Sequence, residues 1–161
     1  MIDAEVRDRF KAEMVDFGLK IKEIDDKRPW GGEFIFDDDQ VDAFIELYFP
    51  THKADRERLS MPKLLIVAPL QRLSWQYHNR RDEIWHVLAG PVGLMSAPSD
   101  EQPPAHELDT GEDAEIDSRV RHRLVGMDGW GVVAELWLNV NPEHLSDEDD
   151  IVRVKDDYNR H

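Results

Sequence analysis

The first third of the chain combines helix-like and strand-like patterns of apolar residues. Near the N-terminus, apolar positions recur every three or four residues, as on one face of an amphipathic helix: Val6, Phe10, Met14, Phe17 and Ile21. Asp3 precedes this run as a candidate N-cap, and Gly18 is a candidate stop. We expect a strand at 33–36 and a second helix at 39–49, ended by Pro50, with this buried stripe: Val41, Phe44, Ile45 and Tyr48.

Beyond Lys63 the pattern changes to short apolar runs interrupted by Pro, Gly and Asp, which is typical of strands. Strands are expected near 63–69, 73–78, 83–88, 91–96, 113–117, 120–125 and 131–140. So many short strands predict an all-β barrel or sandwich. The polar, proline-bearing segment 98–111 predicts a loop between its halves, and Ser146–Asp149 resembles a capping box that would start a short acidic C-terminal helix.

Four residues could form one cage for a divalent metal ion. Gln76 and His78 lie two apart, so on a strand both side chains point to the same face. Glu83 can return on the next strand, and His122 would come from the far half of the fold. This spacing is typical of a cupin metal site, and these donors suit Zn²⁺, Mn²⁺, Fe²⁺, Co²⁺ or Ni²⁺. Gln76, as a neutral oxygen donor, favours a Lewis-acid role over oxygen-activating iron chemistry.

The alternative interpretation is that these are ordinary strand residues that satisfy local hydrogen bonds. For any one of them alone this would be preferred, and the combination is what favours metal. The other histidines are weaker candidates. His86 is an odd number of residues from Glu83, so it should face away from the cage, while His52, His106 and His144 fall in expected loops.

Composition narrows the choice of partners. The 161 residues carry a formal net charge of -15, which makes nucleic acid and anionic membranes unfavourable partners, so an anionic substrate must be bound locally. Cysteine is absent, which excludes disulfides, thiolate ligands and a cysteine nucleophile. Because no leader-like or membrane-spanning apolar run is present, we expect a soluble cytoplasmic protein.

Several motifs resemble the type II mannose-6-phosphate isomerases and the small bacterial cupins named mannose-6-phosphate or phosphoheptose isomerase. The matching residues occur in the family's order across about residues 27 to 160: Arg28–Gly31, Arg72–His78, Arg81, Glu83, Trp85, Gly90, His122–Leu124, Glu135 and Asp149–Tyr158. One departure is the segment 116–121, which lacks the Pro and Gly that family members carry before the last ligand. The placement of His122 depends on that loop.

The resemblance implies a single cupin jelly-roll domain over 1–161, with a helical extension at 1–26, a barrel at 27–145 and a tail at 146–161. It implies a metal-dependent aldose–ketose isomerase acting on a sugar or sugar phosphate, with a divalent ion, preferably zinc, bound by the four-residue cage. It also implies a homodimer. The substrate-binding candidates are Arg81, Lys63, Arg153 and Trp85.

Glu135 is the candidate base for such a reaction. It stands between apolar neighbours on an expected strand, so it should point into the barrel, where it could move a proton between neighbouring carbons. Arg81 would assist it by binding substrate oxygens. An equally weighted alternative is that Glu135 is the partner of a buried arginine.

Two further functions stay open at this level. The first is a non-catalytic carbohydrate-binding cupin that retains metal as a structural element. The second is an iron-dependent dioxygenase on the same barrel, which the glutamine donor disfavours. Cupin barrels support many chemistries, so the fold alone does not choose among them.

Overall fold

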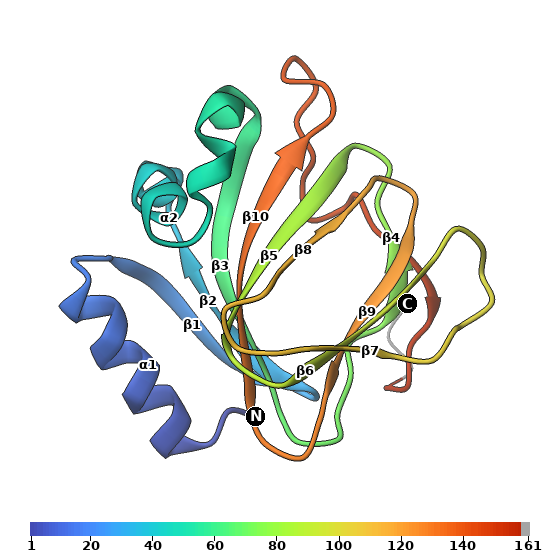
Figure 1. Cartoon of the computed structure of the whole chain (residues 1–161), viewed down its shortest axis with the longest axis horizontal. Helices are drawn as coiled ribbons and strands as arrows, with labels where there is room; N and C mark the ends of the chain where they lie inside the picture. The colour runs from blue at the N-terminus through green and yellow to red at the C-terminus, as the bar shows by residue number, and fades with distance from the viewer. Residues whose placement is uncertain (159–161) are drawn as a thin grey trace.

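Two antiparallel sheets face each other in the computed structural model, which describes residues 1–158 (Figure 1). The six-stranded sheet has the order β1-β2-β3-β10-β5-β8, and the five-stranded sheet has the order β11-β4-β9-β6-β7. The strands are β1 Ile21–Arg28, β2 Gly31–Phe36, β3 Leu59–Val67, β4 Trp75–Tyr77, β5 Arg81–Ala89, β6 Val92–Ala97, β7 His106–Leu108, β8 Asp113–Ile116, β9 Arg121–Gly126, β10 Gly131–Asn139 and β11 Val152–Lys155. This is the predicted cupin jelly roll, and the expected fold class is confirmed.

Strand β10 organises the barrel because it is buried along its whole length between β3 and β5. Its alternate residues enter different cores, as the two-residue period of a strand requires. Ala134 and Leu136 pack in the core beneath the helices, whereas Val133 packs in the core between the two sheets. Glu135 shares the face of Val133, so its side chain lies inside the barrel, as predicted.

The helices cover the outer face of the six-stranded sheet (Figure 1). Helix α1 (Ala4–Asp16) begins at Asp3, whose Oδ1 accepts hydrogen bonds from the backbone N–H groups of Glu5 and Val6 at 2.9 and 3.4 Å. The 3₁₀ helix η1 (Asp38–Gln40) leads into α2 (Val41–Tyr48), and η2 (Pro50–Arg58) follows it. The predicted stripe of α2 is buried, so the second helix is confirmed.

The predicted helical extension at 1–26 is wrong in its second half. Helix α1 ends at Asp16, and Gly18 takes a φ of 76°, which reverses the chain. Residues from Ile21 onward then form β1, which pairs with β2. The barrel therefore begins before the predicted boundary at residue 27.

The C-terminal prediction also needs correction. Ser146–Asp149 does not start a helix: Ser146 and Asp147 are irregular, Glu148 and Asp149 form a turn, and β11 then pairs with β4 at the edge of the five-stranded sheet. The barrel therefore extends past the predicted boundary at 145, and residues 159–161 of the predicted tail lie outside the described range. No helix forms at the capping pattern because Ser146 and Asp150 are buried, and Asp150 is hydrogen-bonded to Ser146 and to the turn between β4 and β5.

Two of the expected loops contain regular structure. Within 98–111, His106 lies in β7, which pairs with β6, and His52 lies in η2 rather than in a loop. Across residues 1–158, none of the helices has the length and apolar character needed to cross a lipid bilayer.

Candidate metal centre

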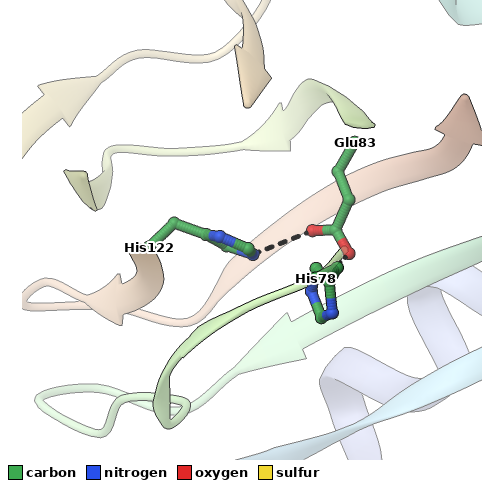
Figure 2. A group of neighbouring side chains, drawn as sticks. All are labelled: His78, Glu83 and His122. Carbon is green, nitrogen blue, oxygen red and sulfur yellow. Dashed lines mark hydrogen bonds and ion pairs between the residues drawn. The ribbon is translucent and has the colours of Figure 1, made fainter. Parts of the chain in front are cut away.

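Three of the four predicted ligands meet inside the barrel (Figure 2). His78 directly follows β4, Glu83 lies on β5 and His122 lies on β9, and all three are buried. One donor atom from each lies within 4.8 Å of the others. The Nε2 atoms of His78 and His122 both stand 3.1 Å from the Glu83 carboxylate, on Oε2 and Oε1 respectively.

Backbone carbonyl groups orient both imidazoles. His78 Nδ1–H donates to the carbonyl of Asp150 at 2.7 Å, and His122 Nδ1–H donates to the carbonyl of Val120 at 3.0 Å. These bonds fix the tautomer in which Nε2 is the free donor atom. Val120 belongs to the segment that departs from the family pattern, and the loop nevertheless directs His122 into the cluster.

The electrostatics of this arrangement favour a cation between the imidazoles and the carboxylate. In the neutral tautomer each Nε2 presents a lone pair to a carboxylate oxygen, an unfavourable contact that a proton or a metal ion between the two atoms would relieve. Burial lowers the pKa of His122, but the adjacent Glu83 carboxylate outweighs burial and raises this pKa above its ordinary value. Burial would raise the pKa of Glu83, yet the two imidazoles and Arg81 hold it well below its usual range. Two imidazole nitrogens with free lone pairs and an ionised carboxylate are a donor set that fits a divalent transition metal.

Arg81 opposes full occupancy of this centre in the arrangement seen here. Its Nη2 lies 3.2 Å from His78 Nε2, and its Nε donates to Glu83 Oε2 at 3.1 Å. Nη1 donates to Ser146 Oγ and the Asp147 carbonyl, at 3.0 and 3.2 Å. The single lone pair on Nε2 cannot both accept a hydrogen bond and bind a metal ion. A metal ion bound to His78 therefore requires that the hydrogen bond from Arg81 Nη2 is broken. Burial, followed by the charge of Arg81, lowers the pKa of His78 despite the nearby Glu83.

Gln76 lies beside the cluster. In the sheet it pairs with His122, and its Oε1 accepts a hydrogen bond from Ser74 Oγ at 2.6 Å. Its side chain lines the same cavity as Glu83 and His122. The role of Gln76 as fourth ligand stays a prediction.

A cavity of about 100 Å³ adjoins the cluster and gathers the remaining predicted site residues. Arg81, Lys63, Arg153, Trp85 and Glu135 all line it. Several other lining residues were not among the predicted site residues: Trp30, Glu33, Ser74, Trp137 and Glu148. Trp30 and Ser74 lie within the family-like segments 28–31 and 72–78. Glu33 and Trp137 alternate with apolar residues on strands that face the barrel, so these four residues carried a usable signal.

Glu135 is bound by two indole groups inside this cavity. Trp85 Nε1–H donates to Oε2 and Trp137 Nε1–H donates to Oε1, each at 2.9 Å. Burial, reinforced by the charge of Glu83, raises the pKa of Glu135 to about 7. Within residues 1–158 no ion pair joins Glu135 to an arginine, so its direct contacts disfavour the buried-arginine interpretation.

Besides Arg81, the two other predicted cationic residues differ in their surroundings. Lys63 lies opposite Glu135 in the sheet, and its Nζ stands 3.6 Å from Glu148 Oε1. Burial lowers the pKa of Lys63, but Glu33, Glu135 and Glu148 together outweigh burial and raise it. Arg153 lies on β11, and its Nε is buried without a hydrogen-bond partner. Both residues can therefore face an anionic group in the cavity.

His86 lies outside the centre, as predicted. Its Nδ1 contacts Asp113, and its ring stacks on Tyr48 of α2 with centroids 5.7 Å apart. Asp82, Glu115 and Asp117 form a second group of carboxylates, of which the last two are exposed.

No model of a known protein family matches the chain, and no curated protein matches it. Solved structures do match. KdgF from Halomonas sp. is 15% identical, with 75% of this chain and 89% of that chain covered and a TM-score of 0.52. CapF from Staphylococcus aureus, a capsular polysaccharide assembling protein, is 12% identical, with 84% and 34% covered and a TM-score of 0.55.

DMSP lyase DddQ from Ruegeria pomeroyi DSS-3 is 18% identical, with 60% of this chain and 43% of that chain covered and a TM-score of 0.47. The chain thus spans less than half the length of DddQ and CapF. At these identities the likeness to KdgF and CapF establishes the cupin fold alone. It does not single out the mannose-6-phosphate isomerase type.

Proposed function

We propose that this protein is a metal-dependent aldose–ketose isomerase acting on a sugar or sugar phosphate. The observation that carries the proposal is the position of Glu135, a buried carboxylate in the same cavity as the group formed by His78, Glu83 and His122. A divalent ion held by that group would polarise a substrate carbonyl and stabilise the negative charge that develops on its oxygen.

Glu135 suits proton transfer at neutral pH. Isomerisation removes a proton from the carbon next to a carbonyl and returns it to the neighbouring carbon, so one group must act first as base and then as acid. A carboxyl group with a pKa of about 7 populates both forms near neutrality. The indole N–H groups of Trp85 and Trp137 hold its two oxygens in place and leave each oxygen a further lone pair for the moving proton.

The cavity limits how a substrate enters. About 100 Å³ is less than the roughly 150 Å³ of a cavity that encloses benzene. A hexose phosphate would therefore place only its reacting end beside Glu135, with the remainder extending past Lys63 toward the exposed carboxylate of Glu148. Lys63 and Arg153 supply the positive charge for an anionic end in a chain whose net charge is -15.

The test is solvent proton exchange with candidate sugars. Metal-loaded protein is incubated in D₂O with mannose-6-phosphate, sedoheptulose-7-phosphate and common pentoses, and deuterium incorporation next to the carbonyl is followed by NMR. We expect exchange with wild type and with Glu107→Gln, an exposed control on β7, and a loss of at least about 100-fold with Glu135→Gln. Metal content must stay equal in all three. Wild type that exchanges no proton in any of these sugars refutes the proposal.

A non-catalytic carbohydrate-binding protein is the second candidate. Three indoles line the cavity, from Trp30, Trp85 and Trp137, and aromatic faces suit sugar rings. Arg81 also satisfies part of the buried cluster without any ion. Sugar binding by wild type without proton exchange, and a Glu135→Gln variant altered only in stability, would favour this function.

A further inference from the structure

Asp150 links the C-terminal segment to His78 and the turn after it through three hydrogen bonds, and a fourth ties it to Ser146. Its backbone carbonyl accepts the Nδ1–H of His78 at 2.7 Å, although the two residues are 72 positions apart in sequence. Its carboxylate accepts the backbone N–H groups of Asn79 and Arg80, both at 2.9 Å, and the hydroxyl of Ser146 at 2.7 Å. Asp150 is only 6% exposed. Asp150, within the family-like segment Asp149–Tyr158, thus contacts the site although it lies far from it in sequence.

The two parts of Asp150 act on the same structural element. The carboxylate fixes the turn at residues 79 and 80, which joins His78 to the strand that carries Glu83. The carbonyl fixes the plane and tautomer of the His78 ring that precedes the turn. If the carboxylate contacts were lost, residue 150 would lose its hydrogen bonds to the backbone of this turn, and its carbonyl would be held less firmly in the position that orients His78.

Ser146 extends the same network to the arginine beside the cluster. Its hydroxyl donates to Asp150 Oδ2 and accepts from Arg81 Nη1 at 3.0 Å. The segment 146–150 therefore acts on both sides of the His78 ring. Ser146 binds the Arg81 guanidinium, which lies against Nε2, and the carbonyl of Asp150 accepts a hydrogen bond from Nδ1. Residues that orient a ligating histidine in this way change metal affinity by about 10- to 100-fold when they are removed.

We propose that Asp150 is the positioning residue of the metal centre, and that docking of residues 146–150 sets its affinity by holding His78 Nε2 as the donor atom. Asp150 touches neither substrate nor ion in this role; it acts through His78. The proposal rests on the metal centre of the proposed function, but not on the identity of the reaction.

Metal affinity in a matched pair of variants tests this role. Asp150→Ala removes the buried carboxylate, whereas Asp149→Ala removes the same charge from the exposed neighbouring residue. Zn²⁺ affinity is measured by competition with a chromogenic chelator on folded, metal-free protein. We expect at least about tenfold weaker binding for Asp150→Ala and less than about twofold change for Asp149→Ala. Unchanged affinity in Asp150→Ala, or an equal loss in both variants, overturns the proposal.

A second measurement separates positioning from general destabilisation. Long-range ¹H–¹⁵N NMR of the imidazoles reports the His78 tautomer in the metal-free protein. We expect protonation at Nδ1 in wild type and in Asp149→Ala, and a mixture of tautomers in Asp150→Ala. Ser146→Ala, which removes one of the three donors to the carboxylate, should give an intermediate loss and serves if Asp150→Ala does not fold.

The two readouts distinguish the possible failures. One possible result is that wild type binds no Zn²⁺ but keeps the Nδ1–H tautomer of His78, and that Asp150→Ala loses this tautomer. This result would refute the metal centre and with it the effect on affinity, while it would support Asp150 as the residue that orients His78. Wild type with the proton of His78 on Nε2 overturns the role of Asp150 whatever the metal result.

Discussion

Replacing Glu135 by glutamine should change how stability depends on pH. In the native state burial and Glu83 raise the pKa of Glu135 from 4.5 to about 7. Between these values the native state holds a proton that the unfolded state releases, so the free energy of unfolding falls as pH rises through this window. At about 1.4 kcal/mol per pH unit, the penalty reaches about 3 kcal/mol above pH 7 and vanishes below pH 4.5.

Glutamine removes this pH dependence but adds a constant cost. Its amide is neutral at every pH, while its NH₂ group must face one of the two indole donors, from Trp85 or Trp137. That mismatch destabilises the variant by about 1–3 kcal/mol at all pH values. We therefore expect the stability of Glu135→Gln relative to wild type to rise by about 3 kcal/mol between about pH 4.5 and about pH 8.

The assay is urea unfolding of both proteins in the presence of a metal chelator. Metal-free protein is needed because a cation near Glu83 would weaken one cause of the raised pKa. Glu107→Gln is the control, because its exposed carboxylate should give a difference from wild type that stays nearly constant with pH. A Glu135→Gln difference that is equally flat would show that Glu135 has an ordinary pKa. It would then also remove the argument for a base that is half-protonated near neutrality.

Three other predictions test the centre and the fold. With free Zn²⁺ about 100-fold above its Kd, the midpoint of thermal unfolding should rise by about 5–10 °C, and His122→Gln should abolish this shift in a scanning fluorimetry experiment. Arg81→Gln should tighten Zn²⁺ binding by about tenfold in calorimetric titrations, because it frees His78 Nε2; the same charge change at Arg80 should not, and weaker binding in Arg81→Gln would contradict the competition. Gly31→Ala should cost at least about 2 kcal/mol in urea unfolding, because φ is 144° and a Cβ would lie 2.0 Å from the Ile66 carbonyl oxygen, whereas Gly129→Ala, with open space around it, should change stability by less than about 0.5 kcal/mol.

The barrel was predictable where the sequence pattern and the buried environment agree. Strand β10 is a continuous, mostly apolar run that begins at Gly131 and ends at Asn139, and each of its residues is buried. Strand β1 was missed because it is an edge strand with mostly polar residues, and because Ile21 extends the three-and-four spacing of α1. The break at Gly18 was recognised, but nothing local shows that the chain then pairs with β2.

The site was predictable in its ligands and much less so in its supports. Two-residue spacing and family resemblance pointed to His78, Glu83 and His122, and these meet in the barrel. The contact that orients His78 comes from Asp150, 72 positions away, and Arg81 beside it is held by Ser146, 65 positions away. Local reasoning assigned Ser146 to a helix cap and gave Asp150 no role beyond its place in the family-like segment, because the sequence offers no sign of a hydrogen-bond partner at such a distance.

Glu83 and Glu135 show how one cavity assigns different chemistry to two identical side chains. Glu83 stays ionised because two imidazoles and a guanidinium surround it, whereas Glu135 faces two neutral indoles and has its pKa raised to about 7. The charge of Glu83 is itself one cause of the raised pKa of Glu135. Neutralising Glu83 with a divalent cation should therefore lower the pKa of Glu135. The pH-dependent stability difference between wild type and Glu135→Gln should then shrink when the protein is loaded with metal, and an unchanged difference would mean that the two carboxylates act independently.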